Sequence, residues 1–332
     1  MVAYDTKTRR PVMEFGPGIA SADGRAYYST FHGRKGTRLW RSDVASGTPT
    51  GSHLLRGYWN AGAVSASGEN VALVLRRPDK TTVQVFDFQR GRATHVLRLR
   101  GNFEVEALSP DGKNVFLIQH LAQRRYLVRQ YDLQHERLVA RPLRAPGVKL
   151  MAGYAWSGVA SRDGKWLLTL YLSTARDTAF VHSLDLERSR PACVSLPSGN
   201  GAFSQLKRYS MTLAPKKRTL YAANPALGVV AEVDLDRSRV VRVSRFKPAA
   251  KAPAGQKAAT LSTISRNSRT LYFSAGRDLW AYDAAYGVVR GPYATNGKIV
   301  GVGYGAKDRR IYAVREDGRM LAFNAATGRR LP

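Results

Sequence analysis

The stretch from Leu108 to His120, LSPDGKNVFLIQH, joins a tight turn to a strand-like run. Asp111 and Gly112 supply the turn, because glycine adopts positive φ without a steric penalty and aspartate accepts bonds from nearby backbone amides. The run VFLIQ that follows is rich in β-branched, aromatic and aliphatic residues, which favour strands. Weaker copies of this stretch recur along the chain. We therefore interpret it as a structural repeat and not as a catalytic site.

Seven copies of the turn recur, at spacings of 40 to 53 residues. A strand-like run follows each copy, and a second marker, an Asp or Asn, then ends another strand. Two markers that keep step over seven units indicate four short antiparallel strands in each unit. The first markers begin at Ser21, Ser65, Ser109, Ser161, Ala214, Ser265 and Gly305, and the second markers are Asp43, Asp87, Asp132, Asp185, Asp234, Asp283 and Asn324.

Four-stranded units at this period are typical of a β-propeller, in which each sheet is covered by its neighbours. The sequence therefore predicts an all-β fold, a seven-bladed β-propeller of four-stranded antiparallel blades, in a single domain over residues 1–332. Apolar residues alternate or run in short blocks, so no helix is predicted. The predicted blades lie near residues 17–60, 61–103, 104–150, 151–205, 206–255, 256–295 and 296–332 together with 1–16.

The repeat resembles the YVTN/SPDG-type propellers, a YncE-like family within the broad WD40-like superfamily. The matching segments are SPDGK at 109–113, LYAAN at 220–224 and VDLDRSRVV at 233–241. The resemblance covers essentially the whole chain and implies the fold. It implies little about function, because members of this family do many different things. The Gly-His and Trp-Asp pairs of true WD40 blades are absent from the sequence.

The first sixteen residues, MVAYDTKTRRPVMEFG, look like the third and fourth strands of a blade, with Asp5 at the second-marker position. We expect the ring to be closed by mixing N- and C-terminal strands. In this mixed blade, Arg10 to Phe15 adds the outer strand to three C-terminal strands. Asp5 and Asn324 then compete for the same third-strand position. An incomplete eighth blade, or a chain cut from a longer parent, is the alternative.

The chain is strongly basic, with 53 Lys and Arg against 24 Asp and Glu and a formal net charge of +29. Such an excess raises the local concentration of anions and speeds encounter with them. The predicted partner is therefore an anionic ligand or a protein. A nucleic acid is compatible with the charge, but no recognition motif supports it. A basic surface that is merely solvated is the alternative.

Several classes of protein and site lack support in the sequence. Cys193 is the only cysteine, so no intrachain disulfide forms. No run reaches the roughly 18 apolar residues of a membrane span, and the N-terminus has no export signal. Metal-ligand spacing and the common catalytic motifs are also absent, so we predict no metal and no cofactor. A monomer is expected, and the compartment is not predicted, since a longer secreted or membrane-anchored parent stays open.

In a propeller, the loops between fourth and first strands, and between second and third strands, gather on one face. Here these loops interleave cations with aromatic residues. Guanidinium groups pair with phosphate or carboxylate, and rings stack on flat or sugar-like groups. We therefore predict a non-enzymatic binding scaffold, unless the rings pack between blades. The predicted ligand-binding residues are Tyr58, Trp59, Asn60, Asn102, Arg124, Arg125, Tyr154, Trp156, Lys207, Arg208 and Asn296.

The alternative function is a propeller hydrolase or lyase, lactonase-like, that acts on a lactone or sugar-like substrate at the channel mouth. The chain is similar in fold to propeller lactonases, which use carboxylates, amides, Arg or His at that mouth. In this case Glu104 and His120 are the catalytic candidates. Clustered carboxylates around a metal would favour the enzyme, whereas cations with aromatic rings favour the scaffold.

Overall fold

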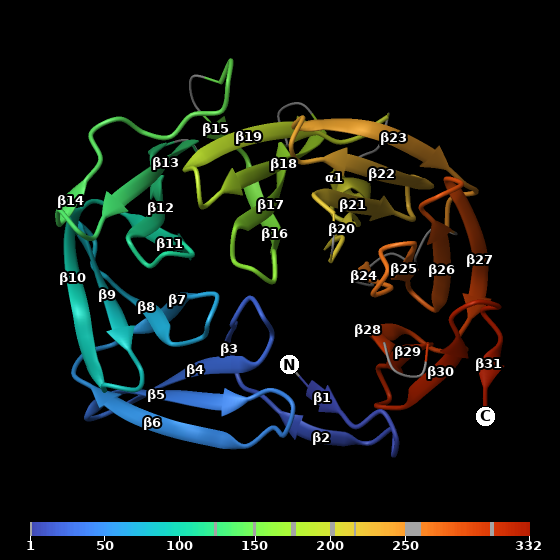
Figure 1. The fold of residues 1–332 in the computed structure, drawn as a ribbon, viewed down its shortest axis with the longest axis horizontal. Helices are drawn as coiled ribbons and strands as arrows, with labels where there is room; N and C mark the ends of the chain where they lie inside the picture. Colours follow the sequence, from blue (N-terminus) through green and yellow to red (C-terminus); the bar gives the residue numbers. More distant parts are fainter. Residues whose placement is uncertain are drawn as a thin grey trace.

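The computed structural model describes residues 2–122, 125–148, 151–173, 177–199, 203–215, 217–249, 260–305 and 309–332. These residues form antiparallel sheets and one short helix, α1 (Phe203–Leu206). Figure 1 shows the sheets following one another around a common axis, which is the arrangement of a β-propeller. The predicted all-β propeller fold is confirmed. The four-residue helix was not predicted, because it lies within a connection and carries no apolar periodicity.

The described residues form seven sheets of four or more strands, which we number blades 1 to 7 in chain order. Blade 1 holds β3 (Gly18–Ala20), β4 (Ala26–Gly33), β5 (Gly36–Asp43) and β6 (Pro49–Leu55), and blade 2 holds β7 (Asn60–Val64), β8 (Asn70–Arg76), β9 (Lys80–Asp87) and β10 (Arg92–Arg100). Blade 3 holds β11 (Phe103–Leu108), β12 (Asn114–His120), β13 (Arg125–Asp132), β14 (Arg137–Leu138) and β15 (Met151–Ala152), the last paired with β13.

The remaining blades have four strands each, paired in chain order. Blade 4 holds β16 (Tyr154–Ala160), β17 (Trp166–Ser173), β18 (Thr178–Asp185) and β19 (Arg190–Ser195), and blade 5 holds β20 (Ser210–Leu213), β21 (Thr219–Asn224), β22 (Val229–Asp234) and β23 (Arg239–Arg245). Blade 6 holds β24 (Leu261–Ile264), β25 (Thr270–Ala275), β26 (Asp278–Asp283) and β27 (Val288–Ala294), and blade 7 holds β28 (Ile299–Gly305), β29 (Arg310–Arg315), β30 (Met320–Asn324) and β31 (Arg330–Leu331).

The repeated turn markers are structural. Ser109 Oγ donates to Asp111 Oδ1 at 2.6 Å and accepts the amide of Asn114 at 2.8 Å, and Asp111 Oδ1 accepts the amide of Lys113 at 3.1 Å. Gly112 has φ of +70°, where glycine avoids the steric cost of a Cβ. The same serine-to-amide bond recurs in four other blades. The second markers likewise accept backbone amides within their own turns.

The hydrophobic core lies between successive blades. Successive residues of a strand point to opposite faces of the sheet, so each inner strand serves two interfaces. In β8, Leu73 packs with Tyr28 of blade 1, whereas Val74 packs with Val105 of blade 3. Each fully buried aliphatic side chain contributes roughly 1.5–3 kcal/mol. Neighbouring blades therefore stabilise one another.

The expected mixed blade is wrong. β31 pairs with β30, so blade 7 is built from C-terminal strands alone. β1 (Val2–Tyr4) and β2 (Pro11–Glu14) instead form a separate two-stranded sheet, and Asp5 closes its turn by accepting the amides of residues 7 and 8. This sheet lies between blades 7 and 1, since Tyr4 packs on Tyr312 and the Phe15 ring lies 4.9 Å from the Tyr27 ring. Asp5 and Asn324 occupy different sheets and do not compete.

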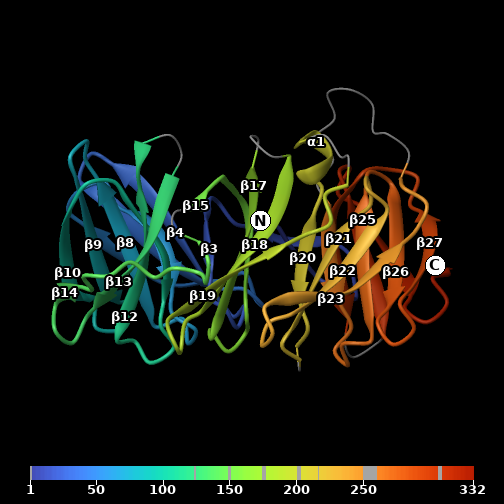
Figure 2. The same ribbon diagram turned by 90° about the horizontal axis from the view of Figure 1, so that it is seen from above.

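The two faces of the ring carry different connections (Figure 2). The loop face carries the connections between second and third strands and between fourth and first strands, including α1 at the upper side of Figure 2. The turn face carries the two sets of marker turns. Within the described part of the chain, no helix has the length and apolar character needed to cross a membrane.

Candidate ligand-binding site at the loop face

The repeat places one set of polar side chains at equivalent positions around the mouth of the ring. The second strands of blades 1 to 3 carry His32, Arg76 and His120 in the same register. The first strands of blades 2 to 4 carry Asn60, Glu104 and Trp156 in the same register. We call these six residues the mouth arc. Their convergence follows from the repeat, because equivalent strand positions lie at equal depth in every blade.

Glu104 joins two cationic or basic neighbours within the mouth arc. Its Oε2 lies 3.1 Å from His120 Nε2 and 3.9 Å from Arg76 Nη2. About half of the Glu104 side chain is exposed, so water screens these pairs and each contributes little to stability. Arg76 Nε also donates to the carbonyl of Phe103 at 3.1 Å, which holds its guanidinium against blade 3.

His32 and Asn60 form the second part of the mouth arc. His32 Nε2 lies 3.3 Å from Asn60 Oδ1, and its Nδ1 lies 3.0 Å from Thr37 Oγ1. The Tyr58 ring lies 5.7 Å from the His32 ring and is 64% exposed, so one of its faces is free to stack on a ligand.

Trp59, predicted as a ligand contact, does not face the mouth. It is 5% exposed and belongs to the cluster between blades 1 and 2. Its Nε1 donates to the carbonyl of Arg56 at 2.7 Å, and its amide donates to Thr37 Oγ1 at 2.8 Å. Thr37 also donates to the carbonyl of Gly57, which turns the loop inward. We therefore remove Trp59 from the candidate site.

Trp156 and Lys207 form an aromatic and cationic cluster at the edge of the mouth arc. Helix α1 positions Lys207, whose Nζ lies 5.1 Å from the Trp156 ring centroid and 4.6 Å from that of Phe203. Trp156 Nε1 donates to the carbonyl of Lys207 at 2.9 Å, and the Tyr154 ring lies 6.0 Å from Phe203. The ammonium group is held between two rings, while Trp156 stays 48% exposed.

The other predicted residues are more dispersed. Asn102 is exposed, and its carbonyl accepts the amide of His120 at 3.0 Å. Arg125 is exposed at the start of β13, and Arg208 is half-buried just after α1. Asn296 lies in the connection between blades 6 and 7, and neither of these blades carries a residue of the mouth arc. Arg124 lies outside the described residues.

The two faces differ in whether their charged side chains have partners. The second-marker aspartates all lie on the turn face, where backbone amides satisfy them. Many loop-face cations, by contrast, form no ion pair among the described residues and are free to attract anions. These cations are Arg34, Lys35, Arg56, Arg77, Lys80, Arg100, Arg125 and Arg277. Within the described ranges, no group of three or more His, Cys, Asp or Glu side chains is placed to hold a metal ion.

Glu106 carries a buried carboxyl and was not among the predicted site residues. Its Oε1 accepts a hydrogen bond from Thr169 Oγ1 of blade 4 at 3.1 Å, and its Oε2 is buried without a partner in the described structure. Burial raises the pKa of this carboxyl to about 7, and the nearby Glu104 carboxylate adds to the rise. Three other blades carry glycine at the equivalent position, namely Gly18, Gly62 and Gly158. A glutamate where other copies of the repeat have glycine is the feature of the sequence that could have identified this position.

No protein-family model matches the chain, and no curated protein matches it. Solved structures of propeller proteins do resemble it. Kuenenia stuttgartiensis hydrazine synthase is 13% identical with a TM-score of 0.52, and 96% of each chain is covered. Dihydro-heme d1 dehydrogenase NirN, in complex with DHE, is 12% identical with a TM-score of 0.56, over 95% of this chain and 64% of that one.

The third similar structure is the β-propeller domain of Cps50 (Swd1) from Myceliophteria thermophila. It is 13% identical with a TM-score of 0.50, over 92% of this chain and 94% of that one. At these identities the likeness shows the fold alone. The chain is therefore similar to β-propellers in fold.

Proposed function

We propose that this protein is a non-enzymatic binding scaffold whose loop face holds an anionic ligand with flat or sugar-like parts. One observation carries the proposal: the mouth arc holds an arginine and two histidines beside exposed aromatic rings, in a face where many other cations form no ion pair among the described residues. Guanidinium and imidazole groups donate to anionic oxygens, while Tyr58 and Trp156 offer faces for stacking.

A sulfated heparin tetrasaccharide is a suitable probe, because it combines sugar rings with anionic groups. We expect Arg76→Gln and Tyr58→Ala each to weaken binding of this probe three- to tenfold, measured by calorimetry at physiological salt. Arg266→Gln is the matched control for charge, since Arg266 is an exposed cation in a turn-face loop of blade 6.

The control separates a site from a general charge effect. If Arg266→Gln weakens binding as much as Arg76→Gln, the net charge of the chain and not the mouth arc holds the probe. A steep fall of affinity with salt that is equal for both variants would lead to the same conclusion.

The second candidate is a hydrolase or lyase acting on a lactone or sugar-like substrate at the same mouth. The contact of 3.1 Å between Glu104 and His120 favours it, because such a pair can transfer a proton. Lactone hydrolysis that disappears in both Glu104→Gln and His120→Gln would support the enzyme. Turnover by neither the wild type nor any variant, with retained probe binding, supports the scaffold.

We also propose the finer features of the fold. The chain is one domain over residues 1–332, a monomer with seven complete blades, and β1–β2 is the outer half of an eighth position. The support is the packing of Tyr4 against blade 7 and of Phe15 against blade 1. Membership of the YVTN/SPDG-type, YncE-like family is proposed on the SPDG turns and their shared hydrogen bonds.

A further inference from the structure

A groove of about 940 Å³ runs along the outer edge of blade 4, at its turn-face side. Its first wall is the segment that follows β14, its floor is β19, and its second wall is formed by the turns of blade 5. The first wall is held in place, because Leu143 forms a bridge to Val128 of β13. We call this feature the outer groove. It shares no lining residue with the mouth arc.

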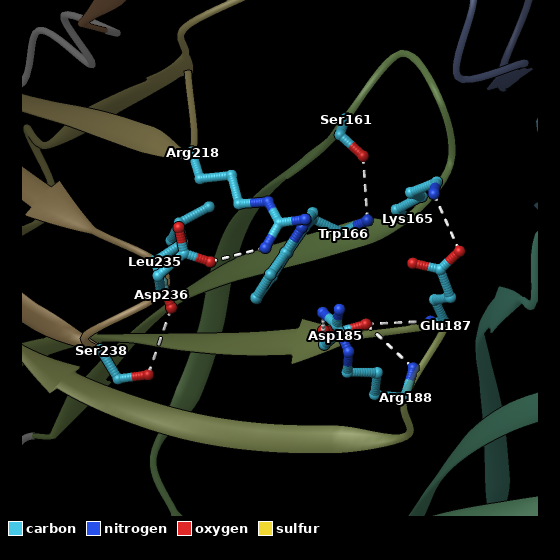
Figure 3. A network of polar contacts seen from close by, with 10 residues as sticks. All are labelled: Ser161, Lys165, Trp166, Asp185, Glu187, Arg188, Arg218, Leu235, Asp236 and Ser238. Carbon is cyan, nitrogen blue, oxygen red and sulfur yellow. Dashed lines mark hydrogen bonds and ion pairs between the residues drawn. The ribbon is translucent and has the colours of Figure 1, made fainter. Parts of the chain in front are cut away.

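The outer groove is lined by four arginines and two aspartates, and the aspartates are already engaged. Asp185, which is nearly buried, accepts Arg188 Nη1 at 3.1 Å and the amide of the same arginine at 3.0 Å. Asp236 accepts Arg218 Nη1 at 2.6 Å. Figure 3 shows both pairs, with Arg218 extending from blade 5 toward Trp166 of blade 4.

Two arginines of the outer groove have no such partner. Arg144 on the first wall and Arg190 on β19 are exposed, and neither forms an ion pair within the described part of the chain. An arginine presents a planar fork of donors that matches a carboxylate. Arg190 on the floor and Arg144 on the first wall are therefore available to bind carboxylates.

The floor of the outer groove is a sheet edge to which no further strand pairs within the part of the chain that the structure describes. β19 is the last strand of blade 4. The amide of Leu196 donates to the carbonyl of Ala179, and the carbonyl of Ala192 accepts Ser183 Oγ, so even-numbered residues face β18. Because the direction alternates in an antiparallel ladder, the backbone amide and carbonyl of Cys193 point outward.

We propose that the outer groove binds an extended acidic peptide segment of a partner protein, which pairs with the edge of β19 and places carboxylates on Arg144 and Arg190. Addition of a strand to a free edge supplies backbone hydrogen bonds, and the arginines select acidic side chains. Pro142 and Pro146 of the first wall and Pro191 of β19 form an apolar lining between the charged positions. The proposal is independent of the loop-face ligand.

A fluorescein-labelled peptide of alternating Asp and Val tests the proposal by fluorescence polarisation. We expect the double variant Arg144→Gln with Arg190→Gln to weaken binding at least tenfold. Arg266→Gln with Arg269→Gln removes the same charge from an exposed turn of blade 6 and should change affinity less than twofold. Equal losses in the two double variants would overturn the proposal, because net charge alone would then account for binding.

Cys193 provides a second readout, because it lines the outer groove and is the only thiol in the chain. Saturating peptide should slow its alkylation by iodoacetamide at least fivefold. N-methylation of alternate peptide amides should abolish this protection if strand pairing holds the peptide. Unchanged alkylation would overturn the proposal, and so would equal protection by a heparin tetrasaccharide, which has no peptide backbone.

Discussion

At position 106 a glutamate carboxyl is buried between blades 3 and 4, where three other blades carry glycine. Burial penalises the charged form and raises the pKa from 4.5 to about 7. The groups that face it from blade 4 are the Thr169 hydroxyl, which donates to it, and the Tyr171 phenol. The folded state therefore holds this proton more tightly than the unfolded chain does.

This linkage predicts the pH dependence of stability. Because the pKa of Glu106 is raised on folding, its contribution is fully present below about pH 4.5 and is lost as the pH rises toward 7. We expect Glu106→Gln to match the wild type near pH 4 and to exceed its free energy of unfolding by about 3 kcal/mol at pH 8. Urea unfolding at both pH values measures the difference.

Two further variants serve as controls for the pH-dependent unfolding of Glu106→Gln. Glu104→Gln removes a lesser cause of the raised pKa of Glu106 from an exposed position on the same strand, so it should reduce the pH dependence only slightly. Thr169→Val removes the hydrogen bond that Thr169 donates to the Glu106 carboxyl and should enlarge the loss of stability at high pH. A Glu106→Gln variant with the same pH profile as the wild type would contradict the argument.

At the scale of the element, two glycines in connecting turns have different physical roles. Gly112, in the SPDG turn, has φ of +70°, and an added Cβ would meet nothing within 4 Å. Gly36, at the start of β5, has φ of +127°, and an added Cβ would lie 2.1 Å from the carbonyl oxygen of Leu55. Position 112 requires glycine only because of its positive φ. Position 36 requires glycine also because a Cβ would collide with the Leu55 carbonyl.

We therefore predict unequal costs for the same substitution. Gly112→Ala should lower the free energy of unfolding by about 1 kcal/mol, the usual cost of a left-handed residue. Gly36→Ala should lower it by roughly 3 kcal/mol or more, because strands β5 and β6 must separate. Chemical denaturation compares them directly, and equal costs would show that the approach to Leu55 relaxes without strain.

At the scale of the whole molecule, the two-stranded sheet β1–β2 joins the first and last blades. Phe15, just after β2, is 6% exposed and packs on Tyr27, whose hydroxyl donates to the carbonyl of Gly16 at 2.8 Å. On the opposite side Tyr4 covers Tyr312 and Met320 of blade 7. Blades 1 and 7 thus depend on this small sheet as the other blades depend on each other.

Removal of the Phe15 ring should loosen this junction. We expect Phe15→Ala to lower the free energy of unfolding by about 3–5 kcal/mol, since it leaves a cavity against Tyr27. Val12→Ala on β2 is the control, because Val12 is 52% exposed and should cost less than about 0.5 kcal/mol. Hydrogen exchange should quicken in blades 1 and 7 and not in blade 4, and uniform quickening would show that β1–β2 has no local role.

The repeat explains why much of the architecture was predictable. Each marker turn is a local device, in which Ser109 and Asp111 accept backbone amides no more than five residues away. Such bonds depend on residue type and spacing, which the sequence displays. The mouth arc was partly predictable for the same reason, since Asn60, Glu104 and His120 follow from strand register.

The residue types and spacings of the repeat were therefore enough to predict antiparallel strand units and the face on which each connection emerges. Contacts between distant segments, by contrast, make β1 pair with β2 apart from blade 7, turn Trp59 inward and bring Glu106 to Thr169. Those outcomes depend on contacts between blades, where residues many positions apart compete for the same space. The repeat shows which hydrogen bonds form within each blade. The packing between blades depends on side chains contributed from the whole ring.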